Sequence, residues 1–158
     1  MLKRLLKKFS DKSDGVEREF DAVHIVFPRK INSNEKHAIK VYYEGFPKEA
    51  INPPWDGGFS WDKDSKGSPW ISVSCQGLGA SVWWPCKDHQ SDEPDSMRIT
   101  CVARSPLKII SNGNLRHEKK YWSQILGTDV NESQWFISYP INNYNVSFYI
   151  GDYIHFSD

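Results

Sequence analysis

Apolar and polar residues alternate with a period of two along much of this chain. The clearest case is Ser96–Arg104, where every second position is apolar, namely Met97, Ile99, Cys101 and Ala103. A period of two sends successive side chains to opposite faces of a β-strand, whereas a helix repeats every 3.6 residues. Helical spacing is confined to the first nine residues. The pattern therefore predicts a protein built from strands.

We expect about ten short strands, because apolar alternation is repeatedly interrupted by clusters of turn-forming residues. The strands are expected at Glu19–Pro28, His37–Tyr43, Phe59–Trp61, Trp70–Cys75, Ser96–Arg104, Leu107–Ile110, Tyr121–Ile125, Gln134–Tyr139 and Asn145–Ile150. The turn D-K-D-S-K-G predicts a hairpin between the third and fourth of these, and S-N-G-N predicts another after Leu107–Ile110. Gly45–Gly58 is rich in proline and glycine and predicts a long ordered loop.

These elements indicate an all-β fold, a β-sandwich of mostly antiparallel strands with long loops. The 158 residues are 39% hydrophobic and 14% aromatic, which is enough to bury one core. There is no internal repeat and no low-complexity linker. We therefore expect a single domain over residues 1–158, preceded by an atypical basic segment at residues 1–15.

The basic segment begins M-L-K-R-L-L-K-K-F, with Leu2, Leu5, Leu6 and Phe9 at helical spacing. One interpretation is a helix on a membrane surface; the other is a short terminal helix or strand laid on the body of the domain. A signal peptide needs an uninterrupted apolar run of about 7–15 residues, and this segment lacks one. The cellular compartment stays open.

The charge balance gives no support to a nucleic-acid partner. Twenty basic and twenty acidic residues cancel, so no global field would attract a polyanion. No apolar run approaches the roughly 18 residues that a transmembrane helix requires. Neither nucleic acid nor a membrane span is expected.

Metal chemistry is weakly represented in the sequence. The zinc-hydrolase pattern H-E-x-x-H is missing, and the nearest approach, at His117-Glu118, lacks the second histidine. An acid cluster of Asp88, His89, Asp92, Glu93 and Asp95 offers oxygen ligands for calcium or magnesium, but its spacing fits no EF-hand loop. A solvated loop is the simpler interpretation. We expect no metal ligands and no cofactor in this chain.

The three cysteines do not form a recognisable reactive pattern. Cys75, Cys86 and Cys101 are not spaced as C-x-x-C, so neither a redox pair nor a zinc knuckle is indicated. No nucleophile lies in a G-x-S-x-G context. We expect the cysteines to be small buried thiols in the core.

Seven tryptophans are more than a sandwich core of this size needs. Exposed indole rings stack on sugars, so one hypothesis is a stand-alone carbohydrate-binding or interaction module. The alternative is that the rings fill the core or contact another domain. The two hypotheses differ in whether the rings are exposed.

The densest stretch, Ser74–Asp95, contains the residues closest to chemistry. It begins S-C-Q-G-L-G, and we expect Gly77 and Gly79 to permit close backbone approach or positive φ beside Gln76. The motif is too short to be a phosphate-binding loop. The candidate binding residues are therefore Gln76, with Gly77 and Gly79 shaping the backbone around it.

The segment S-C-Q-G-L-G-A-S-V-W-W-P-C-K-D resembles a signature of the M1 (gluzincin) zinc aminopeptidases, closest to their leukotriene-hydrolase-like branch. The family pattern is a glutamine at a strand end, aromatic or aliphatic residues, and Pro-Cys-x-Asp. Gln76, Trp83-Trp84, Pro85-Cys86 and Asp88 occupy those positions without a gap. The Asp-x-Pro that follows in the family is interrupted here by H-Q-S-D-E.

The flanking segments are similar to the same family. V-Y-Y-E-G-F-P and P-P-W-D-G-G-F-S-W resemble its approach strands, and S-Y-P-I-N-N-Y-N-V-S-F-Y-I-G-D-Y resembles the last strands before its catalytic domain. The resemblance covers Phe20 to Asp158. It implies the N-terminal β-domain of a larger enzyme, present as a fragment that lacks the first strands and the catalytic domain.

The resemblance implies a specific partner and a specific role. In the family a thermolysin-like catalytic domain follows, with H-E-x-x-H, a third glutamate ligand, a zinc ion and a G-x-M-E-N motif. It hydrolyses N-terminal residues from peptide substrates. The glutamine that matches Gln76 helps to hold the free α-amino group of the substrate. We therefore expect this chain to shape the peptide cleft and to be inactive alone.

Overall fold

The computed structural model describes residues 16–19, 22–87, 89 and 91–157. Residue contacts divide the chain into two compact units, Met1–Pro47 and Lys48–Asp158. The expectation of a single domain stays a prediction. The helix or strand expected in the first nine residues lies outside the described residues.

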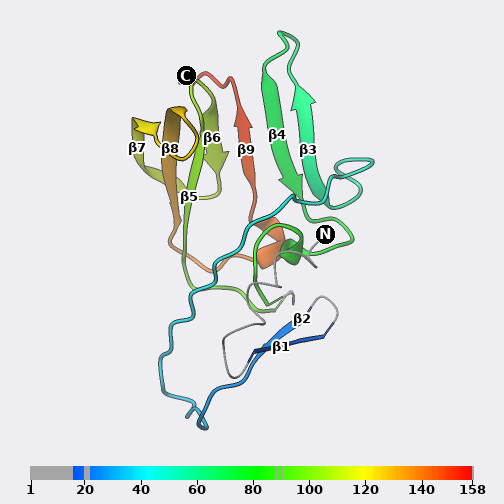
Figure 1. Cartoon of the computed structure of the whole chain (residues 1–158), viewed down its shortest axis with the longest axis vertical. Coiled ribbons are helices and arrows are strands. Elements are labelled where there is room, and N and C mark those ends of the chain that lie inside the picture. The colour runs from blue at the N-terminus through cyan, green and yellow to red at the C-terminus, as the bar shows by residue number, and fades with distance from the viewer. Residues whose placement is uncertain (1–15, 20–21, 88, 90, 158) are drawn as a thin grey trace. The chain divides into compact units, whose positions relative to one another are not determined.

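The first unit contains one small antiparallel pair. β1 (Val16–Glu19) pairs with β2 (Ala22–Ile25), with Val16 opposite Ile25 (Figure 1). The single strand predicted at Glu19–Pro28 therefore contains the last residue of β1 and all of β2, and residues 26–28 are not in a strand. The strand predicted at His37–Tyr43 is wrong, since these residues have no β-pairing and Ile39, Val41 and Tyr43 are exposed. Alternation is not sufficient for a strand when no neighbouring strand pairs with it.

An ion-paired turn follows in the same unit. The Arg29 guanidinium binds both oxygens of Glu35, at 3.1 and 2.8 Å, and Asn32 donates to the same carboxylate at 2.6 Å. These hydrogen bonds, led by that of Arg29, hold the pKa of Glu35 below its usual value. The carboxylate ties the two ends of this turn together.

The second unit confirms the all-β prediction. Its strands form two antiparallel sheets, one in the order β3-β4-β9-β6 and the other in the order β5-β8-β7 (Figure 1). The bounds are β3 (Gly58–Lys63), β4 (Pro69–Ser74), β5 (Met97–Arg104), β6 (Lys108–Ser111), β7 (Asn114–Ser123), β8 (Thr128–Ile137) and β9 (Phe148–Gly151). Two 3₁₀ turns, η2 (Ala80–Val82) and η3 (Asn143–Asn145), join them. The arrangement is sandwich-like.

The hairpin predicted around D-K-D-S-K-G is confirmed. β3 and β4 pair from Gly58 opposite Ser74 to Lys63 opposite Pro69. The Asp64 carboxylate accepts hydrogen bonds from the backbone N–H of Lys66 at 2.8 Å and of Ser68 at 2.9 Å. An aspartate that binds its own turn in this way is the reason such residues favour hairpin connections.

The hairpin predicted at S-N-G-N is wrong. The turn leaves β6, which pairs with β9, and enters β7, which pairs with β8, so it passes from one sheet to the other. Gly113 makes this possible, because its φ is +85° and an added Cβ would lie 2.3 Å from the carbonyl oxygen of Phe136. Only glycine fits so close to a neighbouring strand.

The strands β7 and β8 are longer than the sequence predicted. Tyr121–Ile125 and Gln134–Tyr139 were expected, and each coincides with only part of a ten-residue strand. β7 is an edge strand with its residues exposed from Asn114 to Trp122. A solvated edge strand does not need apolar alternation, so its first half carries no such signal.

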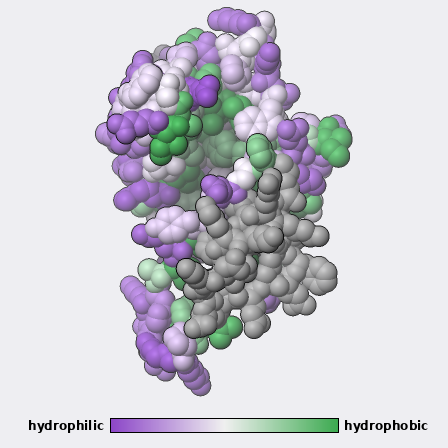
Figure 2. Space-filling view, viewed as in Figure 1, coloured by the Kyte–Doolittle hydropathy of each residue, from purple (hydrophilic) through white to green (hydrophobic). Residues whose placement is uncertain are grey.

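The two sheets are joined by tryptophan rings. Trp83, Trp84 and Trp135 pack with other partly buried residues around a buried cluster of Ile99, Ile137 and Val146. The Trp83 ring also meets the Phe148 ring of β9 edge to face, with centroids 5.2 Å apart. In the space-filling view, apolar side chains gather in a hollow surrounded by hydrophilic ones over the region of the sheets (Figure 2). The tryptophans therefore belong partly to the core.

Replacing Gly113 by alanine should destabilise the fold much more than replacing Gly67. Both glycines have nearly the same positive φ, +85° and +84°, but an added Cβ at Gly67 meets nothing within 4 Å. Gly67→Ala should cost about 1 kcal/mol from backbone strain alone. Gly113→Ala adds a clash with backbone and should cost more than about 3 kcal/mol. Urea unfolding measures both; equal losses would contradict the close approach.

Candidate functional site

Gln76 lies in the tight turn that ends β4. Cys75, just before it, is buried, and its carbonyl oxygen accepts hydrogen bonds from the backbone N–H of Leu78 at 3.2 Å and of Gly79 at 2.8 Å. Gly77 and Gly79 have φ values of +72° and +77°, as the sequence led us to expect. The turn keeps Cys75 inside the fold and leaves the Gln76 side chain exposed.

The loop before β3 packs against the backbone of Gln76. A Cβ added to Gly57 would lie 2.9 Å from the carbonyl oxygen of Gln76. The neighbouring Asp56 carboxylate accepts from the backbone N–H of Ile51 and Asn52, both at 2.6 Å, and the Ser74 hydroxyl donates to the Asp56 carbonyl at 2.9 Å. Within the second unit, the predicted ordered loop is confirmed, and it supports the turn of Gln76.

The partner of Gln76 comes from a distant part of the chain. The hydroxyl of Tyr144, in η3, donates a hydrogen bond to Oε1 of Gln76. The sequence analysis did not identify Tyr144, because 68 residues separate it from Gln76. The segment N-N-Y-N belongs to a flank that resembles the M1 family, and nothing local marks its tyrosine as a contact of the turn.

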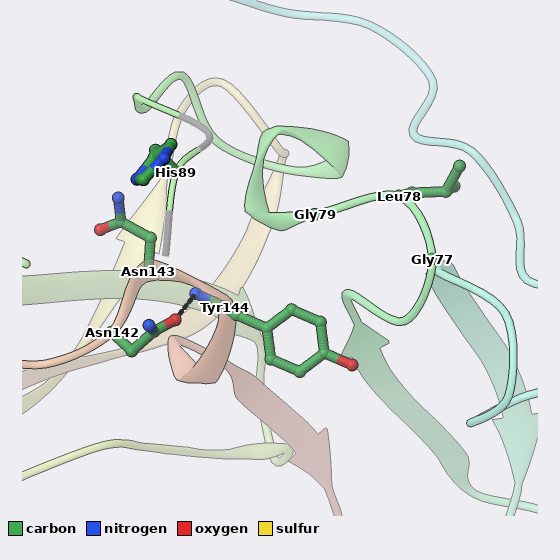
Figure 3. Close-up of a pocket in the computed structure, with 7 residues that line it drawn as sticks. All are labelled: Gly77, Leu78, Gly79, His89, Asn142, Asn143 and Tyr144. Carbon is green, nitrogen blue, oxygen red and sulfur yellow. Dashed lines mark hydrogen bonds between the residues drawn. The ribbon is translucent and has the colours of Figure 1, made fainter. Parts of the chain in front are cut away.

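A pocket of 380 Å³ lies beside this contact (Figure 3). The turn after β4 contributes one wall and the residues around η3 contribute another. Its lining residues are Gly77, Leu78, Gly79, His89, Asn142, Asn143 and Tyr144. In the close-up, the ring of Tyr144 extends from the η3 side toward the end of β4. Tyr144 therefore takes part both in the pocket wall and in the contact with Gln76.

His89 is the member of the acid cluster that lines the pocket. Its Nδ1 accepts a hydrogen bond from the backbone N–H of Ser91 at 3.2 Å and contacts the Ser91 hydroxyl at 2.8 Å. Since Nδ1 acts as the acceptor, this contact assigns the proton of the neutral imidazole to Nε2. His89 can thus offer one N–H donor at the pocket.

The rest of the acid cluster does not assemble into a metal site in the described part of the chain. Asp92 pairs with Lys87 at 3.2 Å, and Asp88 lies outside the described residues. No three His, Cys, Asp or Glu side chains that the structure describes come together as metal ligands. The described residues therefore do not fit a zinc ion.

Two of the three cysteines, Cys75 and Cys101, belong to the core. No disulfide joins the three, all of which the structure describes. Cys75 is buried, and Cys101 packs against the cluster of Ile99, Ile137 and Val146. Burial raises the pKa of the Cys101 thiol to about 11, which favours the protonated, unreactive form. For Cys75 and Cys101 this arrangement agrees with the expected role as small core thiols, whereas Cys86 is only partly buried.

Membrane insertion through a helix finds no support in the part of the chain that is described. None of its helical segments is long and apolar enough to cross a bilayer.

Cys101 should react slowly with iodoacetamide in the folded chain. Raising its pKa from 9.0 to about 11 lowers the thiolate fraction near pH 8 by about 100-fold relative to the unfolded chain. In the folded chain, the rate should keep rising with pH up to about pH 11. Mass spectrometry of each cysteine peptide, with and without urea, measures it. Equal rates at pH 8 in both conditions would contradict the burial.

The chain matches no protein-family model, no curated protein and no solved structure. The resemblance to the M1 aminopeptidases therefore stays an expectation drawn from the sequence. The functional argument depends on the site itself, where an exposed glutamine carboxamide is held by a tyrosine hydroxyl at the edge of a pocket.

Proposed function

We propose that this chain is the non-catalytic N-terminal β-domain of an M1-type zinc aminopeptidase. In this role it shapes the peptide cleft, and Gln76 helps to bind the α-amino group of the substrate. The observation that supports the proposal best is the placement of Gln76. Its side chain is exposed at the end of β4, beside a pocket, and its oxygen accepts a hydrogen bond from the Tyr144 hydroxyl.

The chemistry of a carboxamide suits an ammonium ligand. An ammonium group has three N–H donors, and a carboxamide oxygen has two lone pairs. Tyr144 uses one lone pair of Gln76 Oε1, so one remains for the ligand. A neutral acceptor also loses less hydration than a carboxylate when the cleft closes over it. Gln76 can therefore contribute one directional hydrogen bond to an N-terminal amine.

Under this proposal, the catalytic machinery belongs to a domain outside these 158 residues. The described residues do not assemble zinc ligands, and the sequence has no H-E-x-x-H. Zinc, its ligands and the general base would come from the thermolysin-like partner domain. This chain would contribute shape and one binding residue.

A glycan-binding module is the second candidate, and the exposed indoles are the observation in its favour. Trp55, Trp61, Trp70 and Trp122 are all exposed. The two on the β3–β4 hairpin, Trp61 and Trp70, do not form one platform, however. Trp61 pairs with Ile71 and Trp70 with Asp62 across the strands, so the two rings lie on opposite faces. A glycan array without hits would remove this candidate.

Reading the coding sequence beyond Asp158 tests the aminopeptidase proposal first. We expect H-E-x-x-H, a third glutamate ligand and G-x-M-E-N in the continuation. The purified 158-residue chain should not hydrolyse aminoacyl-anilides when zinc is added. Zinc-dependent hydrolysis by this chain that a chelator abolishes would contradict the proposed division of roles, as would a stop codon directly after Asp158.

In an enzyme that contains both domains, Gln76→Ala should lower kcat/KM for aminoacyl-anilides by roughly 10- to 100-fold. The reason is that a hydrogen bond to a charged group contributes about 1.5–3 kcal/mol. Gln124→Ala is the matched control, because Gln124 is exposed in the turn between β7 and β8. Equal activity of the two variants would overturn the role of Gln76.

A further inference from the structure

The contact between Tyr144 and Gln76 removes an ambiguity of the glutamine side chain. The last torsion of glutamine is broad and roughly two-fold, so a free carboxamide presents its oxygen or its NH₂ group to the same place. An NH₂ group repels an ammonium ligand, whereas the oxygen accepts its protons. The Tyr144 hydroxyl donates to Oε1. A phenol is a stronger hydrogen-bond donor than acceptor, so this contact favours the orientation with the oxygen toward Tyr144 over the one with the NH₂ group there.

The two residues that precede Tyr144 hold its turn in place. The Asn142 side chain accepts from the backbone N–H of Tyr144 at 2.9 Å, which caps η3. The buried Asn143 donates through Nδ2 to the carbonyl oxygen of Lys87 at 2.9 Å. These contacts fix the backbone from which the ring extends.

The next residues of the turn are tied to the corner between the two sheets. Asn112 donates through Nδ2 to the carbonyl of Asn145 at 3.1 Å and accepts from the backbone N–H of Ser147 at 2.8 Å. Val146, between them, is buried in the core cluster. The hydroxyl of Tyr144 is thus carried by a turn with little freedom, as a positioning group requires.

We infer that Tyr144 is a positioning residue that holds the carboxamide of Gln76 with its oxygen oriented to accept a primary amine. This inference rests on the proposed function, which supplies the amine. The second lone pair of Oε1 stays available next to the phenol oxygen, which can itself accept a hydrogen bond. Together, Gln76 and Tyr144 offer two neutral acceptors to one ammonium group.

The alternative is that Tyr144 only covers the wall of the pocket. Its ring lines the pocket and is 39% exposed, so a packing role would survive the loss of the hydroxyl. A test must therefore report on the hydroxyl and on residue 76 together. A titratable group placed at position 76 provides that report on the chain as it stands.

The experiment compares Gln76→Glu with Gln76→Glu/Tyr144→Phe and measures the pKa of the new carboxyl by NMR. A hydrogen bond from the hydroxyl favours the ionised form, so removing the hydroxyl should raise the pKa by about half a unit to one unit. Gln76→Glu/Tyr149→Phe is the matched control, since Tyr149 is 40% exposed. His89 is present in all three variants and cancels in the differences.

A second measurement uses the glutamine itself. In Tyr144→Phe the Gln76 side-chain amide should lose order in ¹⁵N relaxation, while Tyr149→Phe leaves it unchanged. Backbone spectra verify that each variant is folded. A carboxyl pKa that is the same with and without the Tyr144 hydroxyl overturns the inference and leaves the proposed function standing. If the coupling is present but Gln76→Ala does not alter aminopeptidase activity, the proposed function fails, and with it the amine as the ligand of this pair.

Discussion

The packing of tryptophan rings between the two sheets is the interaction on which the second unit depends. Sheets with strands as short as β6 and β9, four residues each, are not stable alone. The Trp83 ring contacts Phe148 of one sheet and packs against the buried cluster that includes Ile99 of the other. The indole N–H of Trp135 donates a hydrogen bond across the sheets to the carbonyl oxygen of Ile109 at 3.3 Å. Since η2 follows the Gln76 turn directly and leads into Trp83, the same packing also anchors the candidate site.

The local part of the fold could be predicted from the sequence, and the pairing between distant segments could not. β5 follows the alternation of Ser96–Arg104 almost residue for residue, because one of its faces is buried against the other sheet. His37–Tyr43 has the same kind of alternation and forms no strand. The S-N-G-N turn looks like a hairpin, yet Gly113 directs the chain into the second sheet. Burial and pairing depend on partners that a local pattern does not contain.

The candidate site, too, could be predicted from the sequence only in its local part. The positive φ of Gly77 and Gly79 could be predicted, because glycines on both sides of Leu78 indicate a turn with left-handed backbone. The hydrogen bond of Tyr144 to Gln76 could not be predicted, because it forms only when η3 lies against the end of β4. The asparagines around Tyr144 are a partial signal, because asparagine favours such capped turns.

The electrostatics of the site explain why orientation matters so much there. The chain has no net charge, and the hydrogen-bonded pair at the site is a carboxamide and a phenol, both neutral. Such a pair exerts little long-range attraction on a cation, in contrast to a carboxylate, which attracts any cation from any direction. If the site binds an amine as proposed, discrimination between ligands would come from the direction of short hydrogen bonds, which weaken steeply when misaligned. Under the proposed function, a glutamine free to exchange its oxygen and its NH₂ group would lose that discrimination, and the turn that carries Tyr144 would then matter as much as Gln76.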